Sequence, residues 1–177
     1  EIVLGVPSPN TGGGPATGIA GPDTGPGIDP RSDFRDLAAF RTVGTGADGR
    51  AAVTFTLPDN ITSWRITSRA VTAGLEAGSE VTAVPVGLPF FVDVTTSDEY
   101  LAADRPVIAL RAYGRGLGQG DAVEYRVSIP SLGVHGAAVE GQAFQRAWFA
   151  LPMLSEGEHA ITVEARSGGM GDAVVRT

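Results

Sequence analysis

The sequence contains no cysteine and no lysine, and only 2 of its residues are histidine. Without cysteine the chain has no disulfide framework and no thiolate ligands for a metal ion. Without lysine it has no lysine–asparagine isopeptide cross-link, and all 13 basic residues are arginine. No apolar run reaches the ~20 residues that a membrane-spanning helix requires. We therefore expect neither a cross-linked surface module nor membrane insertion by this segment.

Charge and composition narrow the class of protein further. The formal net charge of -7 argues against a nucleic-acid partner, which would need a basic patch. The 177 residues suffice for one large domain or two small ones, and 42% hydrophobic content is enough to build cores. The 25 glycines and 12 prolines, with few helical stretches, favour a turn-rich all-β protein.

Patterns that would support catalysis or ligand binding are weak. His135 and His159 lack the spacing of a zinc pair, and no G-x-S-x-G elbow surrounds a serine. The run G-R-G-L-G-Q-G at 114–120 lacks the lysine of a phosphate-binding loop. Four carboxylates could offer oxygen ligands to calcium, but without the EF-hand pattern a solvated loop is favoured. These are Asp93, Asp98, Glu99 and Asp104. We expect no enzymatic activity, no cofactor and no metal.

Residues 47–71 have the clearest pattern of turn and strand residues in the chain. Asp48-Gly49 is a turn signal, because both residues tolerate positive φ. Apolar residues then alternate with small or polar ones through Leu57, which predicts a strand, and Pro58 ends it. A second alternation begins near Trp64. Predicted strands here are Arg50–Leu57, Ser63–Thr72 and Glu80–Val86.

The remainder of the chain predicts further short strands separated by glycine-rich turns. They are Phe90–Thr95, Arg105–Tyr113, Ala122–Ile129, Ala143–Leu151, Glu158–Ser167 and Ala173–Arg176. Strands at this spacing are typical of a fibronectin-like sandwich. The expected core residues are Phe91, Ile108, Leu110, Val123, Tyr125, Val127, Trp148, Ile161 and Val163.

The run D-G-R-A-A-V-T-F-T-L-P-D-N-I-T-S-W-R-I-T closely resembles the signature of the alpha-2-macroglobulin and complement family. That signature is a D-G turn, an apolar strand and L-P-D-x-[IL]-T-[TS]-W-[RE]. L-P-F-F-V-D-V resembles the strand that opens the family's next macroglobulin domain, and S-G-G-M-G-D-A-V-V-R resembles a later strand. The structural residues of the resemblance are Asp48, Gly49, Leu57, Pro58, Asp59, Thr62, Trp64, Phe90 and Phe91.

The resemblance covers roughly residues 33–176 and implies an all-β fold. It implies two fibronectin-III-like (macroglobulin) antiparallel β-sandwiches, the first partial, after a Gly/Pro-rich N-terminal linker. Residues 1–32 would hold an N-terminal strand, Glu1–Val6, and a Gly/Pro-rich linker or bait-like segment. Residues 33–88 would be the C-terminal part of a macroglobulin domain, and 89–177 the following domain.

The resemblance places the bait region, where proteases cut, near residues 7–31. Two interpretations stay open, a bait region and a plain interdomain spacer, because glycine and proline are poor protease targets. The candidate cleavage residues lie just beyond: Arg31, Phe34, Arg35, Leu37 and Phe40. Their apolar members are also spaced for one short helical turn over Arg31–Phe40.

The function that the resemblance implies is a non-catalytic scaffold fragment of a bacterial alpha-2-macroglobulin-like, broad-spectrum protease inhibitor. Its partners would be proteases, met through the full-length parent, and other domains of the parent chain. An extracytoplasmic location is expected. The family's thioester needs a cysteine, so it would lie beyond Thr177. The alternative is a structural or adhesive cell-surface β-sandwich module, and a Cys-Gly-Glu-Gln motif in the parent would favour covalent trapping instead.

Overall fold

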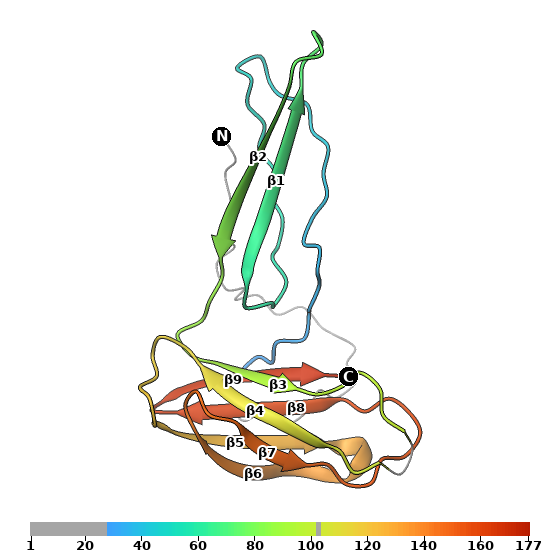
Figure 1. Ribbon diagram of the computed structural model, residues 1–177, viewed down its shortest axis with the longest axis vertical. Helices are drawn as coiled ribbons and strands as arrows, with labels where there is room; N and C mark the ends of the chain where they lie inside the picture. Colours follow the sequence, from blue (N-terminus) through green and yellow to red (C-terminus); the bar gives the residue numbers. More distant parts are fainter. Residues whose placement is uncertain (1–27, 102–103) are drawn as a thin grey trace, which may run out of the picture. The chain divides into compact units, whose positions relative to one another are not determined.

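The computed structural model describes residues 28–101 and 104–177 (Figure 1). The predicted strand Glu1–Val6 and most of the Gly/Pro-rich segment lie outside the described residues. The described chain divides into two units, one containing residues 33–60 and the other containing residues 28–32 and 61–177. The prediction of an all-β fold is confirmed, and the one helical element among the described residues is the 3-10 turn η1 (Pro130–Leu132).

Residues 33–60 contain no strand, so the predicted strand Arg50–Leu57 is wrong. Its alternation is nevertheless present, since Val53 and Phe55 are half-buried between exposed neighbours and Leu57 is half-buried before the buried Pro58. The period-two pattern of burial is therefore present without a strand, and no described strand forms a ladder with these residues. The helical turn expected within Arg31–Phe40 is also wrong, because this segment contains no helical turn and its backbone bonds to distant residues instead.

Residues 63–85 form an antiparallel hairpin of β1 (Ser63–Val71) and β2 (Ala77–Pro85). The register places Trp64 opposite Val84 at one end and Val71 opposite Ala77 at the other. The prediction for β1 is confirmed, whereas β2 begins at Ala77 rather than Glu80. Trp64 and Ile66 are half-buried on one face, as the alternation predicted.

Seven strands in the described residues form two antiparallel sheets that face each other (Figure 1). The first sheet has the order β3-β4-β7, from β3 (Phe91–Thr95), β4 (Val107–Tyr113) and β7 (Ala147–Ala150). The second has the order β6-β5-β8-β9, from β5 (Ala122–Ile129), β6 (Val134–Gln142), β8 (Ile161–Ser167) and β9 (Met170–Arg176). The core lies between the sheets, where Ile108, Leu110 and Val163 are fully buried.

Most of the predicted core is confirmed, with two exceptions. Ile108, Leu110, Val123, Tyr125, Val127, Ile161 and Val163 are buried. Phe91 is only half-buried, because Phe90, Val92 and Val94 take the inward positions of the pleat around it. Trp148 is 59% exposed, because Ala147 pairs with the buried Leu110 and the next side chain therefore points outward.

Strand β6 was not predicted from the sequence, because Gly133 and Gly141 are turn signals. Gly141 is needed at its position: a Cβ there would lie 2.9 Å from Cε2 of Tyr125, whose ring fills the core. The predicted strand Ala143–Leu151 shortens to β7, since residues 143–145 form the turn between β6 and β7 and Phe144 has φ 65°.

Candidate functional site

The candidate cleavage residues begin at Arg31, which pairs with β9 at the edge of its sheet. The Arg31 N–H donates to the Ala173 carbonyl at 2.9 Å, and the Val175 N–H donates to the Arg31 carbonyl at 2.9 Å. These two bonds make a parallel bridge between Arg31 and Val174. The backbone of Arg31 is therefore held against β9 by an isolated parallel bridge.

The Arg31 side chain turns inward and forms a buried ion pair. Its Nη2 lies 2.7 Å from Oδ2 of Asp172 and donates to the Val92 carbonyl at 2.6 Å. The same carboxylate oxygen accepts the Val92 N–H at 2.8 Å. The two side chains are 12% and 7% exposed. Arg31 and Asp172 thus link β9 to the backbone of β3, and a protease cannot reach Arg31 without opening this contact.

The other candidate cleavage residues are more accessible. Arg35 is 51% exposed and its only described ion pair is with the equally exposed Asp33, at 2.6 Å. Leu37 is 65% exposed and Phe40 is 80% exposed, whereas Phe34 is half-buried. The candidate cleavage residues therefore fall into two groups. The Arg31 side chain is largely buried in an ion pair, whereas Arg35, Leu37 and Phe40 are exposed.

The L-P-D-N corner of the signature binds this segment directly. The Asp33 N–H donates to Oδ2 of Asp59 at 2.9 Å, and the Asp59 N–H donates back to the Asp33 carbonyl at 2.7 Å. The Arg35 N–H donates to Oδ1 of Asn60 at 3.0 Å. Pro58 is buried beside them. This link between the signature and the cleavage segment was not readable from spacing, because the partners are 26 and 25 residues apart.

The remaining signature residues have structural positions. Gly49 has φ 74° in a turn closed by Gly46 N–H on Arg50 O at 2.8 Å, and Asp48 Oδ1 accepts the Arg50 N–H. The Thr62 carbonyl accepts the Val86 N–H at 2.8 Å beside the β1–β2 hairpin. Leu57 and Trp64 are half-buried, and Phe90 is buried at 4% exposure while Phe91 points outward.

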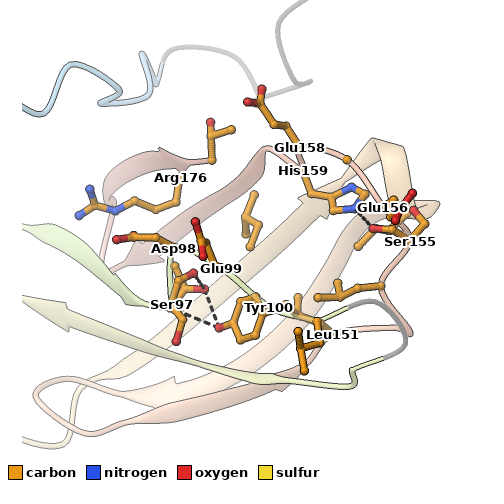
Figure 2. Close-up of a pocket in the computed structure, with 17 residues that line it drawn as sticks. Ser97, Asp98, Glu99, Tyr100, Leu151, Ser155, Glu156, Glu158, His159 and Arg176 are labelled. Carbon is orange, nitrogen blue, oxygen red and sulfur yellow. Dashed lines mark hydrogen bonds between the residues drawn. The ribbon is translucent and has the colours of Figure 1, made fainter.

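A separate pocket of about 440 Å³ lies at one end of the sandwich (Figure 2). Leu132, Leu151, Leu154 and Ile161 line it with apolar surface. Carboxylates of Asp98, Glu99, Glu156 and Glu158 surround it, together with Arg176 and His159. The sequence marked two of these carboxylates and one histidine, but it did not place them in one pocket.

Hydrogen bonds order two polar side chains of the pocket. Burial raises the pKa of Tyr100, but the hydrogen bonds of its hydroxyl with the Thr96 hydroxyl and the Ser97 N–H outweigh burial, and the net pKa lies below the ordinary value. His159 is held through Nε2 by the Ser155 carbonyl and through Nδ1 by the Ser131 hydroxyl, each at 2.9 Å. Because a carbonyl oxygen only accepts, these two contacts fit the tautomer that carries its proton on Nε2 and accepts at Nδ1 from the Ser131 hydroxyl.

The four carboxylates that were considered as calcium ligands do not converge. Asp93 lies on β3 opposite Arg111, Asp104 Oδ2 accepts the Leu101 N–H at 3.0 Å, and Asp98 and Glu99 line the pocket. His135 lies on β6, apart from the pocket. Across residues 28–101 and 104–177, no three acidic or histidine side chains gather as a metal site. Nor does that part of the chain hold a helix long and apolar enough to span a bilayer.

Comparison with known proteins points to one family. The family model of the alpha-2-macroglobulin family matches residues 38–106. An alpha-2-macroglobulin homolog of Deinococcus radiodurans is 40% identical over 90 residues, which are 51% of this chain and 9% of that protein. The alpha-2-macroglobulin of Ralstonia nicotianae is 33% identical over 91 residues, which are 49% of this chain and 6% of that protein.

The matched segment spans less than a tenth of either relative's length, so the matches identify this region rather than a whole protein's activity. The family model covers the turn at Gly49, the L-P-D-N corner and the β1–β2 hairpin, and it ends before β4. Residues 38–106 are therefore similar to the alpha-2-macroglobulin family and carry its pattern.

Proposed function

We propose that this chain is a non-catalytic scaffold segment of a bacterial alpha-2-macroglobulin-like, broad-spectrum protease inhibitor, and that proteases cut it within residues 31–40. The observation that carries the proposal is the reciprocal pair of hydrogen bonds between Asp33 and Asp59. It joins the family signature to the candidate cleavage segment. The relatives' names, both alpha-2-macroglobulin, support the inhibitor function.

The geometry of the segment favours cleavage downstream of Arg31. A protease needs an accessible segment without helix or strand, and residues 33–40 are such a segment, with the exposed side chains Arg35, Leu37 and Phe40. Proteases of differing specificity would each find a residue there, because the run offers one basic, one aliphatic and one aromatic side chain. That mixture fits a broad-spectrum role.

The domain limits and the location belong to the same proposal. Residues 1–32 would be the N-terminal strand and bait-like or linker segment, 33–88 the C-terminal part of one macroglobulin domain, and 89–177 the next. The parent protein would act outside the cytoplasm, where it meets foreign proteases. Other domains of the parent would enclose the protease.

The test uses the full-length parent protein and trypsin. After mixing, enclosed trypsin should still hydrolyse a small amide substrate but should lose activity on a large protein substrate, because enclosure excludes large molecules. A parent with residues 35, 37 and 40 all changed to glycine should lose this size discrimination for trypsin, chymotrypsin and elastase alike. Unchanged discrimination in that variant would refute the cleavage site, and its absence in the wild type would refute the inhibitor function.

The alternative is a structural or adhesive surface module, and one feature favours it. The outward face of the β3-β4-β7 sheet carries Phe91 stacked on Tyr113 with ring centroids 5.5 Å apart, and Phe144 lies 6.2 Å from Tyr113. Arg146 lies 6.0 Å from the exposed ring of Trp148. Aromatic residues with arginine are common at protein interfaces. A parent that binds a surface through this face and leaves proteases unaffected would support the alternative.

A further inference from the structure

Strands β3 and β9 lie side by side at one edge of the sandwich (Figure 1), and we call the junction between them the β3–β9 seam. Its members are Val92 of β3 and Gly171, Asp172, Ala173 and Val175 of β9. β9 is the last strand of its sheet and β3 the last of the other. Each therefore presents backbone groups at an edge, where another extended chain can pair.

Three separate features of the seam recognise residues 28–32. The β9 backbone pairs with Arg31 through both its N–H and its carbonyl, each at 2.9 Å. The Asp172 carboxylate and the Val92 carbonyl form a buried socket for a guanidinium. Gly171 leaves space for Ile28, since a Cβ on Gly171 would lie 2.6 Å from Cδ1 of Ile28.

These features match the general way in which sheet edges bind peptides. Backbone pairing supplies affinity, and side-chain pockets at defined spacings supply specificity. The guanidinium donates through Nε as well as Nη2, at 3.2 and 2.7 Å to Asp172, a planar arrangement that lysine cannot reproduce. The seam is thus built to select an extended segment with isoleucine and, three residues later, arginine.

We propose that the β3–β9 seam is a peptide-binding site filled in cis by residues 28–32, and that it holds this segment after the chain is cut downstream. The described contacts of Arg31 run directly to β3 and β9, so none of them passes through the peptide bonds that follow Ser32. A break within residues 36–41 would leave them intact. This inference does not depend on the proposed inhibitor function.

The experiment uses the complete chain with residues 36–41 replaced by the recognition sequence of a site-specific protease. After cutting, hydrogen exchange at the Val175 amide reports the seam, because that amide donates to the Arg31 carbonyl. Size-exclusion chromatography shows whether the N-terminal fragment stays bound. We expect co-elution, and protection of Val175 at least about tenfold above that in the cut Arg31→Ala variant.

Matched variants separate the seam from the Asp33–Asp59 contacts. In the cut chain, Arg31→Ala should release the fragment, Arg31→Lys should weaken retention, and Asp59→Ala should leave it bound. Amides of β5 and β8 serve as the folding control, and Asp172→Asn is the second test if Arg31→Ala disturbs them. An isotopically labelled peptide of residues 26–35 should exchange into the wild-type complex, whereas the same peptide with Arg31→Gln should not.

Opposite outcomes would overturn the proposal. Release of the fragment from the cut wild-type chain, or loss of Val175 protection on cutting, would show that the seam depends on chain continuity. Release by Asp59→Ala with retention in Arg31→Ala would assign the attachment to the L-P-D-N corner. Equal exchange of both peptides would show that the seam does not select arginine.

Discussion

Arginine-specific proteolysis should distinguish Arg31 from Arg35 by about a hundredfold in rate. Cleavage after Arg31 requires the loss of two backbone hydrogen bonds of 2.9 Å and of an ion pair whose side chains are 12% and 7% exposed. Each of the two backbone hydrogen bonds contributes ~1 kcal/mol, and the charged contact between Arg31 and Asp172 contributes about 2 kcal/mol. Opening this contact therefore costs about 4 kcal/mol. Arg35 loses one exposed bond and one exposed ion pair, together about 1 kcal/mol. The difference of ~3 kcal/mol corresponds to roughly two factors of ten.

The assay is a trypsin digestion followed over time by mass spectrometry, with cleavage after each arginine quantified separately. A synthetic peptide of residues 26–41 gives the intrinsic preference of trypsin for the two bonds, and dividing by it isolates the effect of the fold. Arg31→Lys should bring the ratio closer to that of the peptide. A normalised ratio below about threefold would refute the reasoning, because it would mean that the Arg31–Asp172 contact opens as readily as exposed chain.

Three further predictions concern stability and chemistry. Gly114→Ala should lower the free energy of unfolding in urea by about 3 kcal/mol or more, because φ is 142° and a Cβ would lie 2.1 Å from the Pro89 carbonyl oxygen. Gly87→Ala, which has open space around it, should lower it by less than ~1 kcal/mol. Equal losses in the two variants would contradict this prediction. Burial raises the pKa of Tyr125 above 10.0, so the stability it contributes is present below pH 10 and lost as pH rises toward the folded-state pKa. Unfolding free energies between about pH 8 and 11 should therefore fall less in Tyr125→Phe, and parallel curves would be the contrary result. We expect no ester or peptide hydrolysis by this chain, and turnover that vanishes in His159→Ala would overturn that expectation.

The turns and several strand limits could be predicted from the sequence, because each depends on residues that are neighbours in the chain. Turns at Gly49 and Gly133 follow from the φ that glycine permits, and both glycines have φ above 70°. The limits of β1 and β5 follow from period-two alternation bounded by turn residues. The L-P-D-N corner carried the family resemblance because its residues are contiguous. Such features need no knowledge of distant partners.

Other features depended on partners that only the fold brings together. Arg31 lies 141 residues from Asp172 in sequence, so the residues around Arg31 could not predict its buried ion pair. Alternation predicted that Phe91 and Trp148 belong to strands, but which face is inward depends on register with β4. A one-residue shift in that register reverses both faces. The sequence by itself therefore determined the class of fold and the family pattern, whereas tertiary pairing decided which candidate residues are buried and which are exposed.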